Sequence, residues 1–235
     1  ADEVWIPQAA VEETLREYGY KGKVEVVDNG SDFAGNIPVE QLRRSARDKL
    51  RLPSDEFMFL FVGQHIWEKN LEFLLEALAE IRTLPFRMYF IGSGYAASEL
   101  RRKTEDLYLT DKVIFMGSIT ERERLKLYYA AADLFLFPSL YDNAPLVVRE
   151  AAALHTPSLL IKGSTSAEVI HDSVNGFLSD NSVTAYASRI SQLLETPQLI
   201  AEAGEAASHS IARSWEDVAE EVYDRYVNLI HRSGN

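Results

Sequence analysis

The chain has 235 residues, of which 46% are hydrophobic, and a formal net charge of −12. It is long enough to bury a full core, and its acidity argues against binding to nucleic acid and against strong electrostatic attachment to anionic lipid, since both require a basic surface. The absence of cysteine excludes disulfides and thiolate chemistry and fits a cytoplasmic protein. No apolar run approaches the ~20 residues that span a bilayer, and no signal peptide is recognised.

The first fifty residues predict a strand near the start, a helix at about 9–18 and an extended segment at 23–33, KVEVVDNGSDF. Gly30 in that segment is expected to form a turn, because glycine readily adopts a positive φ. The chain begins at Ala1 without a methionine, which suggests a fragment of something longer.

From Phe57 onward, short apolar runs alternate with longer helical periods, which indicates an α/β fold with a parallel sheet flanked by helices. The predicted strands are 57–62, 87–91, 113–115, 134–137, 158–161 and 176–178. The predicted helices are 71–81, 121–131, 166–171, 182–195, 197–208 and 214–231. Two of these helices are preceded by apparent capping boxes, Thr120 with Glu123 and Thr165 with Glu168.

The most informative segment is SLYDNAPLVVREAAALHTP at 139–157, which places two carboxylates on either side of a predicted helix start. Pro145 suits the first turn, so Asp142 lies in the preceding loop and Glu150 about two turns into the helix. Ala144 is a poor cap, which leaves the first N–H groups and the positive end of the helix dipole available to a phosphate or diphosphate. This arrangement suits a nucleotide sugar.

The same segment resembles the acidic-x7-Glu signature of family 4 retaining glycosyltransferases of the GT-B fold, which usually reads PS-x-x-E-G-F-P/G-L-x-x-x-E-A-x-A-x-G-x-P. Three places depart from it: Asp142 replaces the first Glu, Asn143-Ala144 replaces Gly-Phe, and His155 replaces Gly. The resemblance covers nearly the whole chain and implies a Rossmann-like C-terminal half of a GT-B enzyme. It divides the chain into a remnant of the N-terminal domain and linker at 1–20, a donor-binding domain at 21–210 and a C-terminal helix at 211–235.

The resemblance implies transfer of a sugar from a nucleotide diphosphate sugar to a hydroxyl acceptor with retention, and the family's habits suggest UDP. Three residues would be catalytic: Glu150 would accept hydrogen bonds from the ribose, Lys69 would stabilise the departing diphosphate, and Asp142 would contact only the donor sugar. The donor-binding residues implied are Gly63, Gln64, Lys69, Met116, Asn143, Ala144, Leu146, Val147 and Glu150. Glu150→Ala is expected to weaken nucleotide binding, because it removes a charged hydrogen-bond acceptor. Folding is expected to survive, because alanine suits a helix interior.

The loop after the first strand of the main domain, FVGQHIWEKN, departs from the family's G-R-x-x-x-x-K at one position. Gln64 stands in place of the Arg and removes a bidentate donor to phosphate. Gly92-x-Gly94-x-x-Ala97 matches a dinucleotide-binding fingerprint formally, but the next strand lacks the acidic residue that would hold an adenosine ribose. Glu168 and the Asn175-Gly176 turn also match the family, and no catalytic role is assigned to them.

Neither a cofactor nor a metal is expected. No D-x-D occurs, and the five histidines are scattered; His65 and His155 are expected to be structural. Two alternatives stay open: a catalytically degenerate nucleotide-sugar-binding module, and a GT-B sugar-nucleotide epimerase or phosphorylase. The expected partners are the donor and the chain's own N-terminal acceptor domain, which is absent here. The fragment alone is therefore expected to be inactive, and the whole enzyme cytoplasmic, with attachment to the inner membrane face through the missing domain as an option.

Overall fold

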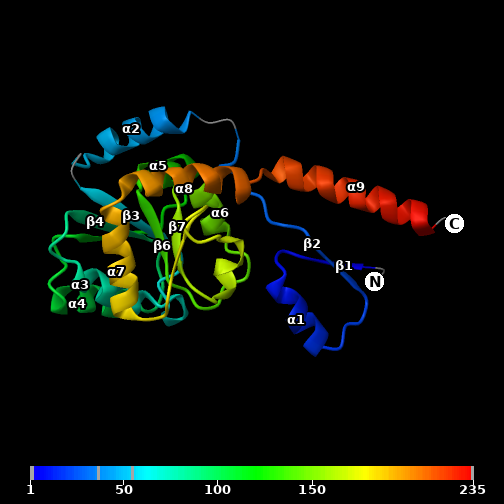
Figure 1. Ribbon diagram of the computed structural model, residues 1–235, viewed down its shortest axis with the longest axis horizontal. Helices are drawn as coiled ribbons and strands as arrows, with labels where there is room; N and C mark the ends of the chain where they lie inside the picture. The colour runs from blue at the N-terminus through cyan, green and yellow to red at the C-terminus, as the bar shows by residue number, and fades with distance from the viewer. Residues whose placement is uncertain (1–2, 36–37, 54–55, 234–235) are drawn as a thin grey trace.

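The computed structural model describes residues 3–35, 38–53 and 56–233. Its main body is a parallel sheet of six strands in the order β5-β4-β3-β6-β7-β8 (Figure 1). The strands are β3 Phe57–Val62, β4 Phe86–Ile91, β5 Val113–Gly117, β6 Leu134–Phe137, β7 Ser158–Ile161 and β8 Phe177–Ser179. The six expected strands are confirmed, and most of them are short apolar runs, which are typical of a sheet covered on both faces.

Helices cover both faces of this sheet. They are α2 Val39–Leu50, α3 Leu71–Glu80, α4 Ala97–Asp106, α5 Arg122–Ala131, α6 Leu146–Ala153, α7 Val183–Leu194 and α8 Pro197–Ser210. In Figure 1, α2 packs on α5 above the sheet, and α3 packs on α4 below it. The helix expected at 166–171 is only a short 3-10 turn, η2, at Thr165–Val169.

Helix α2 was not expected from the sequence, and its attachment explains why. Only Val39 and Ala46 of this helix are buried. It is held largely by two arginines: Arg43 and Arg47 both pair with Asp133, just before β6, and Asp133 also accepts the N–H of Met58 in β3 at 2.7 Å. Leu42, Ala46 and Leu50 do form a narrow apolar stripe that packs against the core, but polar and charged residues outnumber them along the helix.

The order of the strands fixes where a ligand can bind. After β3 the chain adds β4 and β5 on one side, and then returns to add β6, β7 and β8 on the other. The reversal therefore lies between β3 and β6, which pair through Phe59 with Leu134 and Leu60 with Phe135. In open parallel sheets, ligands bind outside the carboxyl ends of the strands at such a switch point.

A smaller unit precedes the main sheet. β1 (Glu3–Ile6) and β2 (Lys23–Val26) form a separate parallel pair connected by α1 (Ala10–Glu17). β2 thus joins β1 and α1 in this unit, and the domain boundary expected between residues 20 and 21 stays a prediction; Ala1 and Asp2 lie outside the described residues.

The last helix, α9 (Trp215–Ser233), projects from the main body and lies beside this unit (Figure 1). Trp5 meets Tyr226 edge to face at 4.9 Å, and Arg225 pairs with Glu25 at 3.0 Å.

Gly30 does not have the positive φ that was expected. A Cβ there would come within 2.8 Å of Trp215, so close approach to the start of α9 is what requires glycine. None of the helices within the described residues is long and apolar enough to cross a membrane.

Candidate functional site

Two loops meet at the switch point of the sheet. The loop after β3 contains the 3-10 turn η1 (Trp67–Lys69), and the loop after β6 leads into α6. Lys69 Nζ forms an ion pair with Asp142 Oδ2, and Asn70 Nδ2 donates to the carbonyl of Pro138 at 3.3 Å. The structure therefore brings together two of the expected catalytic residues, which lie 73 positions apart in the sequence.

The start of α6 is open, as expected. Pro145 is its N-cap residue and no side chain caps it. The side chain of Asn143 is exposed, Leu146 is 43% exposed and Val147 is half-buried. Because the first N–H groups of a helix have no intrahelical partner, those of Leu146 and Val147 can bind an anion.

Ala144, in contrast, is buried and already bonded. Its N–H donates to Gln8 Oε1 at 2.5 Å, and its carbonyl accepts from Asn29 Nδ2 at 3.2 Å. Its φ is +44°, in the left-handed region. Gln8 and Asn29 were not anticipated, since no local pattern shows that the segment around β1 and β2 fastens this loop.

Glu150 lies on the buried side of α6, where only 7% of the residue is exposed. Its Oε1 accepts from Arg122 Nη2 and its Oε2 from Tyr129 Oη, both at 2.8 Å. Burial, together with the Glu150 carboxylate, raises the pKa of Tyr129 well above its ordinary value, so the hydroxyl stays a donor. A carboxylate has about four lone-pair sites, so the two bonds orient Glu150 and leave acceptor capacity for a ligand.

Arg122 connects Glu150 to the segment that follows β2, through Asp32 and Phe33. Its guanidinium lies over the ring of Phe33 at 4.2 Å and pairs with Asp32 at 3.2 Å. Arg122 and Tyr129 are seven residues apart on α5, so they share one helix face. The spacing of Arg122 and Tyr129 in the sequence indicated that they share a helix face. Nothing in the sequence indicated that this face meets Glu150.

The glycine-rich loop after β4 packs on the loop after β3. A Cβ on Gly92, whose φ is +138°, would stand 1.9 Å from the carbonyl oxygen of Gly63, and one on Gly94 would stand 2.3 Å from that of His65. Close packing thus explains both glycines of the apparent fingerprint. Gln64, which lies between Gly63 and His65 in the chain, is exposed, and Met116, near the end of β5, accepts a weak hydrogen bond from Tyr128 at 3.9 Å.

The two histidines expected to be structural occupy a packed position and a turn. His65 is buried beside Phe61, Phe90 and Phe115, and its ring nitrogens have no hydrogen-bond partner within the described residues. Burial, with a smaller effect from the charge of Arg101, lowers its pKa. His155 ends α6 with a φ of +57°, in the left-handed conformation that its family equivalent, glycine, adopts readily.

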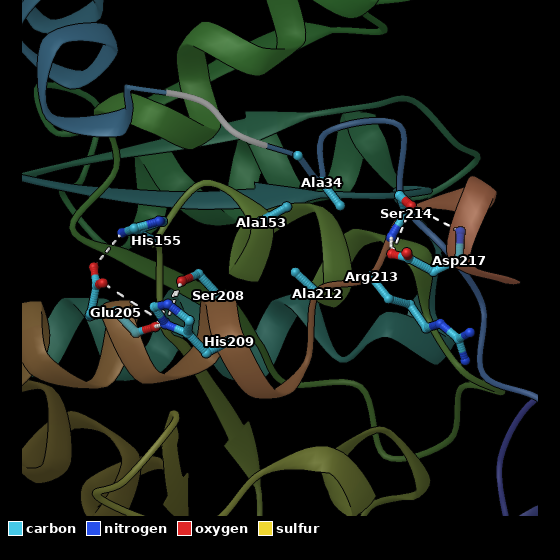
Figure 2. Close-up of a pocket in the computed structure, with 11 residues that line it drawn as sticks. Ala34, Ala153, His155, Glu205, Ser208, His209, Ala212, Arg213, Ser214 and Asp217 are labelled. Atoms are coloured by element: carbon cyan, nitrogen blue, oxygen red, sulfur yellow. Dashed lines mark hydrogen bonds and ion pairs between the residues drawn. The ribbon is translucent and has the colours of Figure 1, made fainter.

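His155 borders a hollow of about 540 Å³ between the end of α6, α8 and the start of α9 (Figure 2). Its polar groups bond to one another: His155 pairs with Glu205 at 2.8 Å, and Ser214 donates to Asp217 at 2.7 Å. None of the residues expected to bind the sugar donor lines this hollow. The hollow is therefore separate from the site at the switch point.

Neither expected capping box forms. The helix near Thr120 has Glu121 as its N-cap and no capping side chain. Thr165 instead accepts the N–H of Asp142 at 2.8 Å and donates to its carbonyl at 2.9 Å. The Glu168 carboxylate accepts the N–H groups of Ala9 and Ala10 at 2.8 and 3.0 Å, and so caps α1 rather than its own turn.

Among known protein families, residues 43–210 match the model of the glycosyl transferases group 1. The chain belongs to this family. The group 1 chain is 32% identical over 232 residues to D-inositol 3-phosphate glycosyltransferase 2 of Catenulispora acidiphila, covering 93% of this chain and 54% of the relative. It thus spans about half the length of the curated relatives that it matches.

Two solved structures show the fold of this group 1 glycosyltransferase chain. Sucrose-phosphate synthase from Thermosynechococcus elongatus superposes with a TM-score of 0.84 at 26% identity, covering 99% of this chain and 59% of that one. HepE from Anabaena, in complex with UDP and glucose, superposes with a TM-score of 0.80 at 20% identity, covering 97% and 64%. The expected family and its GT-B fold are confirmed; the roles of individual site residues stay predictions.

Proposed function

We propose that this chain is the donor half of a retaining glycosyltransferase that transfers a sugar from a UDP-sugar to a hydroxyl acceptor. The observation that carries the proposal is the meeting of Lys69 with the Asp142 loop and the open start of α6 at the switch point. A cation beside unpaired helix N–H groups is a preorganised site for a diphosphate. Uridine follows the family resemblance, and HepE, which shares the fold, was solved with UDP.

Each group would then have a distinct task. Lys69 and the N–H groups of Leu146 and Val147 would hold the diphosphate, and Glu150, oriented by Arg122 and Tyr129, would accept from the ribose hydroxyls. In transfer, the bond from the anomeric carbon to the diphosphate oxygen breaks, the acceptor oxygen bonds to the carbon on the face that the nucleotide leaves, and the acceptor's hydroxyl proton passes to the leaving diphosphate oxygen. Negative charge develops on the leaving diphosphate, so groups placed there in advance lower the barrier. With this positive charge supplied by the chain, we expect transfer without a metal.

We expect the chain to bind UDP with a dissociation constant of ~1 mM or tighter, because both walls of the diphosphate site belong to it. Isothermal titration calorimetry with UDP, GDP and ADP measures this, with uridine as the control that lacks the diphosphate. Uridine should bind more weakly than UDP. If none of the three diphosphates binds at millimolar concentration, the donor-domain function is wrong.

A further inference from the structure

Lys69, expected to bind the diphosphate, and Asp142, expected to bind the donor sugar, form an ion pair with each other. Their side chains are 17% and 22% exposed, and Lys69 Nζ also lies 5.7 Å from the centre of the Phe137 ring. Thr165 holds the backbone of Asp142 from both sides. Asp142 is therefore kept at Lys69 by its own loop, and a diphosphate must compete with it for the cation.

The pair is not needed to hold the two loops together. Asn70 already donates to the carbonyl of Pro138 at 3.3 Å, while the hydroxyl of Ser139 is shared between the carbonyl of Tyr141 at 3.1 Å and that of Glu68 at 3.4 Å. Thr165 separately anchors the Asp142 loop to η2. Because other hydrogen bonds also join these loops, the ion pair can open without separating them, and its electrostatic effect on a ligand follows from that.

That effect differs between a donor and a product. When a diphosphate binds Lys69, the Asp142 carboxylate loses its partner and faces added negative charge, which costs free energy unless a new donor satisfies it. The hydroxyls of a donor sugar are such donors, whereas a nucleoside diphosphate without a sugar offers none. We infer that the Lys69–Asp142 pair discriminates between the nucleotide sugar and the nucleoside diphosphate left after transfer: the sugar opens the pair, and its loss lets the pair re-form and expel the diphosphate.

This inference rests on the proposed function and revises one expectation. Asp142 was expected to contact only the sugar, so Asp142→Asn would have left UDP affinity unchanged. The ion pair predicts instead that Asp142→Asn tightens UDP binding roughly threefold to tenfold, because a neutral amide competes less for Lys69. Affinity for a UDP-sugar should rise less or fall, since the sugar loses a charged acceptor.

Calorimetry on the 235-residue chain tests this, with UDP, UDP-glucose, UDP-galactose and UDP-N-acetylglucosamine as the probes. Glu68→Gln is the matched control. Glu68 is the neighbour of Lys69 in the chain, but its carboxylate accepts from the Tyr95 hydroxyl at 2.5 Å and not from Lys69. The same loss of charge at Glu68 should change UDP affinity by less than about twofold. Thermal unfolding confirms that both variants fold.

The possible outcomes distinguish a failure of this inference from a failure of the proposed donor-binding function. Tighter UDP binding in Asp142→Asn alone, with a smaller gain or a loss for the UDP-sugar, supports the discriminating pair. If the wild type binds UDP but Asp142→Asn binds it no tighter, or Glu68→Gln tightens it equally, the inference is overturned and the donor-domain function stands. If the wild type binds no nucleotide, both are wrong.

Discussion

Replacing Glu150 with alanine is expected to lower the free energy of unfolding by about 3 kcal/mol, the scale of a truncation that leaves buried polar groups unpaired. The variant removes both bonds at 2.8 Å, leaving the buried Tyr129 hydroxyl without its acceptor and Arg122 with its contacts to Asp32 and the Phe33 ring. The expectation that the variant folds, which rests on the helix propensity of alanine, stays a prediction, and the loss of these two bonds adds a cost in stability to it. Urea unfolding followed by circular dichroism measures the change.

Two further variants show whether the bonds cause the loss. Glu105→Ala, on the exposed side of α4, should change stability by less than about 0.5 kcal/mol. Tyr129→Phe should destabilise the wild type by ~1 kcal/mol but be nearly neutral once Glu150 is alanine, because the hydroxyl it removes is then already unpaired. If the effects of Tyr129→Phe and Glu150→Ala simply add, the two side chains do not stabilise each other.

Replacing Lys69 with glutamine is expected to weaken UDP binding by about 2 kcal/mol, or roughly 30-fold, the scale of one hydrogen bond to a charged group. The variant removes a charge-assisted donor to the diphosphate and leaves the Asp142 carboxylate to repel it. Calorimetry with UDP measures the loss, and thermal unfolding verifies that the fold is retained.

Lys103→Gln is the control for the loss of a positive charge. Lys103 lies on α4, where it pairs with Glu72 at 2.8 Å and Glu76 at 2.7 Å, and it has no part in the proposed site. Its replacement should leave UDP affinity within about twofold of the wild type, since a screened surface charge acts weakly at a distance. A Lys69→Gln variant that binds UDP as tightly as Lys103→Gln would remove Lys69 from the diphosphate site.

Local patterns were sufficient for most of the main sheet. β3 and β6 are continuous apolar runs and β7 is apolar after its first residue, a pattern typical of strands buried in a parallel sheet. The helices α2 and α4 were missed because polar and charged residues dominate them, with only Leu100 and Thr104 buried in α4. Their positions depend on ion pairs and neighbouring helices, which periodicity does not reveal.

In the candidate site, too, local features could be predicted from the sequence but tertiary contacts could not. Helix chemistry around Pro145 predicted an open N-terminus preceded by Asp142, and the structure has one. The partners of these residues could not be predicted, because they come from distant segments: Glu168 caps a helix 159 positions earlier in the chain, and Arg122 binds Glu150 from a different helix. A sequence motif identifies which groups are present, whereas tertiary contacts decide which of their hydrogen bonds are free.

A crystal structure of this chain with UDP tests the central claim most directly. The account predicts a diphosphate at hydrogen-bonding distance, about 3 Å, from Lys69 Nζ and the first N–H groups of α6, with the ribose hydroxyls on Glu150. It would be contradicted by UDP bound elsewhere, for example in the hollow beside His155 and Glu205, with the Lys69–Asp142 pair undisturbed.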